Sequence, residues 1–163
     1  MPPGTAKVTS RRDVNYQREN AVSLDQSAIG NAVLAQARSP ENSTVLMIDD
    51  EKLNSFVVAV YLKAGGYREL VHTTDPLAAI ALAERTHPDA ILLDIEMPRL
   101  DGIQLLRQIR SNTALSQTHV LILSATDDER IKAEARTLGV AGFLKKPIKK
   151  EELLSTLAAV LSS

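Results

Sequence analysis

The sequence has no cysteine and few aromatic residues, since phenylalanine, tyrosine and tryptophan together make up 3% of its 163 residues. The absence of cysteine excludes disulfide bonds and thiolate metal sites, and it fits a reducing compartment. Because aromatic side chains are scarce, aliphatic side chains and alanine must fill the core. A hydrophobic content of 44% is enough for that purpose. The length allows one ordinary domain with an extension.

An excess of charge of one sign is also missing, because 19 basic residues nearly balance 20 acidic ones and the formal net charge is −1. No overall field therefore favours nucleic acid or an anionic membrane. No apolar run approaches the roughly 20 residues of a membrane-spanning helix, and no signal-peptide core is visible. We expect a cytoplasmic protein that contacts neither nucleic acid nor membrane directly.

The first 43 residues differ in composition from the remainder of the chain. They begin with a polar, proline-containing stretch without hydrophobic periodicity, which predicts a flexible and mostly disordered extension over residues 1–43. A short amphipathic helix is predicted over residues 24–38, with Ile29, Val33 and Leu34 on one side. Two interpretations of it remain open: a helix without a partner, or a helix that docks on the following domain or on a second copy.

From residue 44 onward, apolar strand patterns alternate with helical patterns. The predicted strands cover residues 44–48, 70–73, 90–93, 119–123 and 140–144. Five βα units within about 120 residues predict a domain over residues 44–163 of the α/β class. We expect a doubly wound, five-stranded parallel sheet with helices on both faces.

The helices between these strands carry their own signals. In the first, apolar residues recur at the spacing of an amphipathic stripe that faces the core: Leu53, Phe56, Val57, Val60, Tyr61 and Ala64. In the second, Asp75 is the predicted cap of a helix that Pro76 opens, and the apolar residues expected inside are Leu77, Ile80, Ala81 and Leu82. Asp127 is the predicted cap of the charged fourth helix, which ends at Gly139.

Asp94 stands out because four apolar residues, 90–93, run into it without alternation. A continuous apolar run is typical of a strand whose sheet is covered on both faces. An unpaired carboxylate is costly away from water, so Asp94 marks the end of burial. It should therefore lie at the carboxyl end of a central parallel strand, where open α/β folds bind ligands.

Three other predicted strands end in residues with related chemistry. Asp49 and Asp50 follow the first strand, Ser124 follows the fourth, and Lys146 follows the fifth. Neighbouring carboxylates repel one another unless a cation joins them, and hard oxygen ligands suit Mg²⁺. A metal ion and a lysine around Asp94 are what phosphoryl transfer to an aspartate requires.

Four motifs in order resemble the receiver domain of bacterial two-component response regulators. They are Met47-Ile48-Asp49-Asp50-Glu51, Leu93-Asp94-Ile95-Glu96-Met97-Pro98 with Asp101-Gly102, Leu123-Ser124-Ala125, and Phe143-Leu144-Lys145-Lys146-Pro147. Any one of them is a weak signal, whereas four at the right spacing are a strong one. The resemblance covers about residues 44–163 and implies a flavodoxin-like sheet with strand order 2-1-3-4-5.

The resemblance implies a role for each matching residue. Asp94 would be the phosphoacceptor, charged by a sensor histidine kinase or a histidine phosphotransfer protein. Asp49, Asp50, Asp94 and the backbone carbonyl of Glu96 would bind Mg²⁺ or Mn²⁺. Ser124 and Lys146 would bind the phosphoryl group.

The same resemblance implies a switch and a readout surface. Ser124 and Phe143 resemble the family's switch pair, and the surface formed by the fourth helix, fifth strand and fifth helix would be read by a partner. Lys146 is preferred to Lys145 because strand alternation turns Lys145 away, and in this family the Lys146–Pro147 bond is typically cis. Glu96, two residues after the acceptor, is expected to influence the lifetime of the phosphoryl group.

Other functions remain as alternatives. A receiver used only for binding, without phosphorylation, is one. An aspartyl-nucleophile phosphatase is another, because Asp94-Ile95-Glu96 is similar to its Asp-x-Asp signature, although that signature ends the first strand of its family and no cap domain fits here. His72, His87 and His119 lie on separate elements and form no ligand-like group.

The output of the domain stays open at this point. The chain is read either as a single-domain regulator or as part of a longer one. The expected partners are a kinase or phosphotransfer protein, a downstream protein target or output domain, and a second copy in a homodimer.

Overall fold

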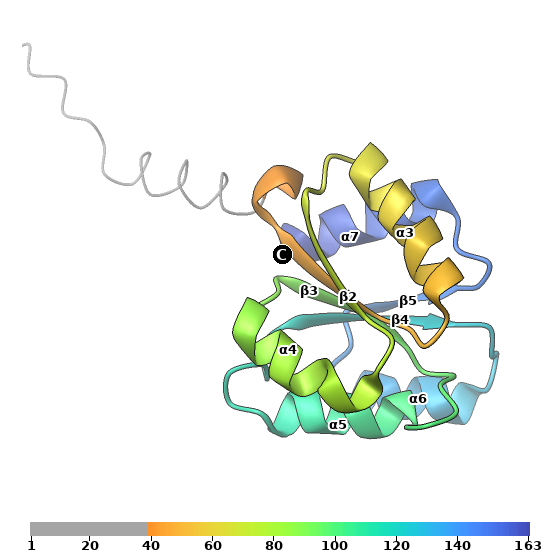
Figure 1. The fold of residues 1–163 in the computed structure, drawn as a ribbon. Coiled ribbons are helices and arrows are strands. Elements are labelled where there is room, and N and C mark those ends of the chain that lie inside the picture. Colours follow the sequence, from red (N-terminus) through yellow and green to blue (C-terminus); the bar gives the residue numbers. More distant parts are fainter. Residues whose placement is uncertain (1–38) are drawn as a thin grey trace, which may run out of the picture. The chain divides into compact units, whose positions relative to one another are not determined.

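The computed structural model describes residues 39–163, so the helix predicted over residues 24–38 lies outside the described part of the chain. Five strands form one parallel sheet in the order β2-β1-β3-β4-β5 (Figure 1). They are β1 Thr44–Ile48, β2 Glu69–Thr73, β3 Ala90–Asp94, β4 His119–Ser124 and β5 Gly142–Lys145. The predicted fold class and strand order are confirmed.

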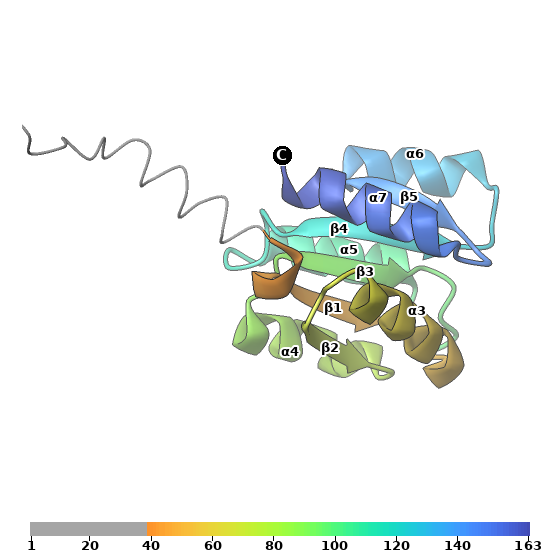
Figure 2. The same cartoon turned by 90° about the horizontal axis from the view of Figure 1, so that it is seen from above.

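Helices cover both faces of this sheet, as Figures 1 and 2 show. The α-helices are α3 Lys52–Ala64, α4 Ala79–Thr86, α5 Gly102–Ser111, α6 Glu129–Thr137 and α7 Lys150–Leu161, and the short 3₁₀ helices are η1 Pro40–Asn42 and η2 Pro76–Ala78. Helices α3 and α7 pack on one face, and α4, α5 and α6 pack on the other. None of the helices within residues 39–163 combines the length and the apolar composition of a membrane-spanning segment.

Alternate residues of the central strands supply the two layers of the core. On β1, Val45 and Met47 belong to the apolar cluster shared with α3 and α7, whereas Leu46 and Ile48 belong to the cluster shared with α4, α5 and α6. Every residue of β3 is buried. A strand buried on both faces must be apolar at every position until it reaches the rim, which accounts for the unbroken run before Asp94.

The predicted buried face of α3 is wrong. The helix buries Ser55, Val58 and Leu62 instead. The predicted stripe lies largely on the surface, with exposed fractions of 72% at Leu53, 66% at Phe56, 37% at Val57 and 47% at Val60. Helix α3 carries apolar side chains on two opposite faces, so periodicity alone could not identify which face packs on the sheet.

Two smaller expectations about the second and fourth helices also need correction. Leu77 is 67% exposed, and it belongs to the separate 3₁₀ turn η2, residues 76–78, which precedes α4. The side chain of Asp75 does accept a hydrogen bond from the Leu77 amide, as a cap should. The cap of α6 is Asp128 rather than Asp127, since its carboxylate accepts a hydrogen bond from the Arg130 amide at 2.9 Å.

Candidate functional site

Asp94 is the last residue of β3 and is only 2% exposed. Helix α5 begins close behind it, because Asp101 caps that helix and Gly102 leaves room for the main chain of β3. A Cβ atom at Gly102 would lie 2.7 Å from the Asp94 carbonyl oxygen. Asp94 is therefore held at the rim of the sheet by main chain packed on both sides.

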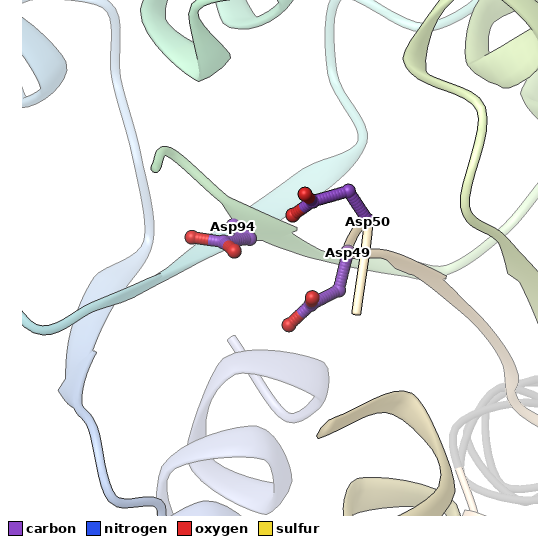
Figure 3. Close-up of side chains that lie close together, drawn as sticks. All are labelled: Asp49, Asp50 and Asp94. Atoms are coloured by element: carbon purple, nitrogen blue, oxygen red, sulfur yellow. The ribbon is translucent and has the colours of Figure 1, made fainter. Parts of the chain in front are cut away.

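Three carboxylates meet at this rim, and Figure 3 shows Asp49 and Asp50 from the end of β1 facing Asp94 from the end of β3. One carboxylate oxygen of each lies within 4.8 Å of the others. Asp49 is 3% exposed, so two of the three side chains are removed from water. Such a cluster of hard oxygen donors is unfavourable alone and fits a divalent cation such as Mg²⁺.

Lys146 supplies the positive charge of the described site. Its Nζ atom lies 2.8 Å from Oδ2 of Asp94 and 3.3 Å from Oδ2 of Asp49, and the Lys146–Pro147 peptide bond is cis. Lys145 points elsewhere and pairs with Asp127 on the surface at 2.5 Å. Strand alternation thus separates the two lysines as expected, one into the site and one to solvent.

Burial and charge act on these groups in opposite directions. Burial raises the pKa of the Asp49 carboxyl, although a hydrogen bond from the Glu51 amide and the charge of Lys146 lower it in part. Burial alone would lower the pKa of Lys146, but its ion pairs with Asp94 and Asp49 outweigh that effect and raise it. The ion pairs thus favour the protonated form of Lys146, while burial disfavours the ionised form of Asp49.

Ser124 and Phe143 line a cavity that contains none of the three clustered carboxylates. This small cavity has a volume of about 140 Å³, and Phe143 is half-buried with the guanidinium of Arg136 5.5 Å from its ring centre. The Ser124 hydroxyl accepts a hydrogen bond from the Thr126 amide at 3.0 Å. The Ser124 hydroxyl thus lies at this cavity with Phe143, and among the described contacts it makes no hydrogen bond to Asp94 or Lys146. The Ser124 carbonyl oxygen accepts a hydrogen bond from the Lys146 amide at 2.9 Å.

Glu96 makes two contacts at the mouth of the site. Its amide donates a hydrogen bond to Oδ1 of Asp94 at 2.9 Å. Its carboxylate accepts one from the Ala125 amide at 2.7 Å, although the two residues are 29 positions apart. The first contact places the Glu96 main chain beside the carboxylate cluster. The second was not predicted, because no sequence pattern pairs a side chain with a main-chain amide in another loop.

The site opens into a pocket with one polar and one apolar wall. The pocket has a volume of about 670 Å³ and contains Asp94, Lys146 and the two carboxylates after β1. Its other wall comes from α3, where Leu53 and Val57 of the exposed face line it. The exposed apolar face of α3 is therefore continuous with the pocket that holds Asp94.

Three comparisons place this geometry among known proteins. Residues 45–158 match the family model described as the response regulator receiver domain. The chain is 39% identical to Protein PilG of Pseudomonas aeruginosa over 119 residues, which is 73% of this chain and 87% of PilG. It is similar in structure to the chemotaxis response regulator CheY4 of Vibrio cholerae, with a TM-score of 0.67 and 30% identity over 72% of this chain and 98% of CheY4.

A further similar structure is the receiver domain of the sensor histidine kinase PA1611 from Pseudomonas aeruginosa, described with a magnesium ion coordinated in its active-site cleft. The TM-score is 0.67 and the identity 30%, over 74% of this chain and 98% of that domain. The similar solved structures agree with the observed fold. The chain belongs to the family of response regulator receiver domains.

Proposed function

We propose that this receiver is a phosphoacceptor that takes a phosphoryl group from a histidine kinase or a histidine phosphotransfer protein onto Asp94. The observation that carries the proposal is the position of Asp94, which is buried, belongs to the three-carboxylate cluster and contacts Lys146 at 2.8 Å. In the transfer, an Asp94 oxygen forms a bond to phosphorus while the phosphorus–nitrogen bond breaks and the donor imidazole leaves. Receivers are signalling modules, and self-phosphorylation and autodephosphorylation would be this chain's only chemistry.

The residues present fit a divalent cation. Asp49, Asp50 and Asp94, with the backbone carbonyl of Glu96, would hold Mg²⁺ or Mn²⁺, and the PA1611 receiver domain supports this assignment by its similarity. When bound, the ion supplies positive charge next to the oxygens of the transferred group. Lys146 would supply a second positive charge and bind a phosphoryl oxygen. Its raised pKa keeps that charge in place at neutral pH.

The signal would pass from Asp94 to a partner through Ser124 and Phe143. The Ser124 hydroxyl would exchange its bond with the Thr126 amide for one to the phosphoryl group, and the Phe143 ring would turn inward behind it. The surface that changes is formed by α6, β5 and α7, and it would bind a downstream protein, an output domain or a second copy. We propose that this signalling takes place in the cytoplasm.

A phosphoryl analogue tests the proposed function. In the presence of Mg²⁺, beryllofluoride should raise the melting temperature of the protein by several degrees, because a ligand at 100 times its Kd adds about 2.7 kcal/mol of stability. Asp94→Asn should abolish the beryllofluoride effect. Differential scanning fluorimetry measures both, and an equal rise in the variant would place the ligand elsewhere.

The exposed apolar face of α3 supports a docking site for the phosphodonor. Four large side chains, Leu53, Phe56, Val57 and Val60, are exposed together, and two of them line the pocket of Asp94. A contiguous apolar patch on a small protein commonly marks an interaction site. A donor that buries this face would bring its phosphohistidine to Asp94.

Phe56→Asp is expected to slow transfer from a protein donor about tenfold or more, because a charge would replace an aromatic anchor in the buried interface. Transfer from acetyl phosphate should not change, since this small donor needs no docking face. Leu77→Asp is the matched control, as Leu77 is 67% exposed and Phe56 is 66% exposed. The measurement is the transfer rate from a histidine phosphotransfer domain that phosphorylates the wild-type chain. Equal rates for the two variants would contradict the docking site.

A further inference from the structure

Glu96 connects two loops at the mouth of the site. Its amide is bound to Oδ1 of Asp94, and its carboxylate is bound to the amide of Ala125, so that one residue connects the loop after β3 with the loop after β4. Both ends of the carboxylate contact, Glu96 and Ala125, line the pocket that contains Asp94 and Lys146. Glu96 therefore lies at the opening of the pocket through which a phosphoryl group would reach Asp94.

The amide that Glu96 occupies is well placed to bind an oxyanion. In the sheet register Asp94 lies beside Leu123, two residues before Ala125. Residues with side-chain donors that line this pocket include Lys146, Asn54 and Tyr61. The amide of Ala125 is already used by the Glu96 carboxylate at 2.7 Å. A hydrogen bond between an amide and an ionised group is among the stronger ones, so this contact competes with any second anion.

The same contact holds the loop in its present position. Ser124 and Thr126 flank Ala125, and the Ser124 hydroxyl accepts a hydrogen bond from the Thr126 amide on the side of the small cavity that contains Phe143. Because Glu96 binds the Ala125 amide from the pocket side, the main chain of the neighbouring Ser124 is restrained as well. Movement of that hydroxyl toward Asp94 requires this loop to rearrange.

We propose that the Glu96 carboxylate is an internal anionic latch, which binds the Ala125 amide in the unphosphorylated protein and gives it up to a phosphoryl group on Asp94. The inference rests on the proposed function, since it describes the regulation of the same site. The carboxylate opposes phosphorylation in two ways: it occupies a donor, and it adds negative charge beside the incoming group. The hydrogen bond keeps the loop in its resting position until the phosphoryl group displaces it.

Three substitutions separate the hydrogen bond from the charge. Glu96→Ala removes both, Glu96→Gln keeps the length and an acceptor oxygen but removes the charge, and Glu96→Asp keeps the charge on a side chain one methylene shorter. Glu84→Ala is the control, because Glu84 is exposed and its carboxylate accepts a hydrogen bond from Asn112 on a distant surface.

The first readout is the amide proton of Ala125 in the unphosphorylated protein, measured by NMR. It should be shifted downfield and protected from exchange in the wild type, in part in Glu96→Gln, and not in Glu96→Ala or Glu96→Asp. The second readout is the initial rate of phosphorylation by acetyl phosphate with Mg²⁺. We expect Glu96→Ala, which loses both the hydrogen bond and the charge, to react about three- to tenfold faster than wild type. Glu96→Asp, which loses only the hydrogen bond, and Glu96→Gln, which loses the charge and keeps the bond in part, should have rates between those of Glu96→Ala and wild type.

Each alternative has a distinct result. If Glu96→Asp reacts like wild type while Glu96→Ala is faster, charge alone acts and the latch is contradicted. Unchanged rates in all three variants, with phosphorylation of the wild type intact, also contradict the latch but leave the phosphoacceptor function standing. If the wild type itself takes up no phosphoryl group, the proposed function fails and the latch fails with it.

Discussion

Replacing Lys146 by alanine is expected to slow phosphorylation by acetyl phosphate about a hundredfold, the usual cost of removing a preorganised charge from a phosphoryl-transfer site. The Lys146 ammonium group contacts Asp94 at 2.8 Å and Asp49 at 3.3 Å. Without it, two buried carboxylates lose the positive charge of their ion pairs, and no other ion pair with Asp94 or Asp49 is present among residues 39–163. Phosphorylation with Mg²⁺ is followed by intact-protein mass over time.

Lys145→Ala is the matched control for this prediction. Lys145 is the neighbouring residue of the same type, but it pairs with Asp127 on the surface and faces away from the carboxylates. Its variant should be phosphorylated at close to the wild-type rate. Circular dichroism establishes that the Lys146→Ala protein is folded, because removing one partner of a buried ion pair also lowers stability. An equal loss of phosphorylation rate in both variants, or no loss in Lys146→Ala, would contradict the role assigned to Lys146.

Gly102→Ala is expected to lower the free energy of unfolding by about 3 kcal/mol, which is large for the addition of one methyl group. A Cβ atom there would lie 2.4 Å from Cα of Ile95 and 2.7 Å from the carbonyl oxygen of Asp94. Both contacts are with main chain, so either α5 or the end of β3 must move. Urea unfolding measures the loss, and the remaining folded protein should be phosphorylated more slowly because Asp94 is displaced.

Gly65→Ala is the control for steric contact of a different kind. Its Cβ atom would also come within 2.4 Å of a neighbour, but that neighbour is the end of the Leu154 side chain, which can change its rotamer. We expect a loss of about 1 kcal/mol or less at this position. If the two alanine variants unfold at the same urea concentration, the close contact between Gly102 and the main chain of β3 does not cause the expected loss of stability.

The sequence was most informative where each strand meets the rim of the sheet. The apolar run before Asp94 exists because β3 is buried on both faces, and a carboxylate can follow such a run only where the strand reaches the site. The same reasoning located Asp49 and Asp50 after β1, and strand alternation separated Lys146 from Lys145. These positions follow from local rules, since burial and alternation depend on neighbouring residues in the same strand.

Features that depend on contacts between distant segments were predicted poorly. The buried face of α3 was assigned to the wrong side, because the helix has one apolar face for the sheet and a second, exposed one beside the pocket. The cap of α6 was assigned to Asp127, whose carboxylate instead pairs with Lys145 and Lys132. The contact of Glu96 with Ala125 joins two loops that no periodicity connects.

The wrongly predicted face of α3 and the unpredicted contact of Glu96 both lie at the site. An apolar face that does not pack on the sheet and a carboxylate that does not bind the cluster both border the pocket of Asp94. Departures from simple sequence rules are expected at functional sites, where packing and charge serve binding in addition to folding. In this receiver the two departures correspond to the proposed docking face and the proposed latch.

The most direct measurement is the intact mass of the protein after incubation with Mg²⁺ and acetyl phosphate, compared between wild type and Asp94→Ala. The account predicts the gain of one phosphoryl group in the wild type and none in the variant, with the gain lost when the metal is chelated. A wild-type protein that gains no mass and does not bind beryllofluoride would contradict it and leave a receiver fold used for binding alone. A variant that gains the same mass would place the phosphoryl group on another residue.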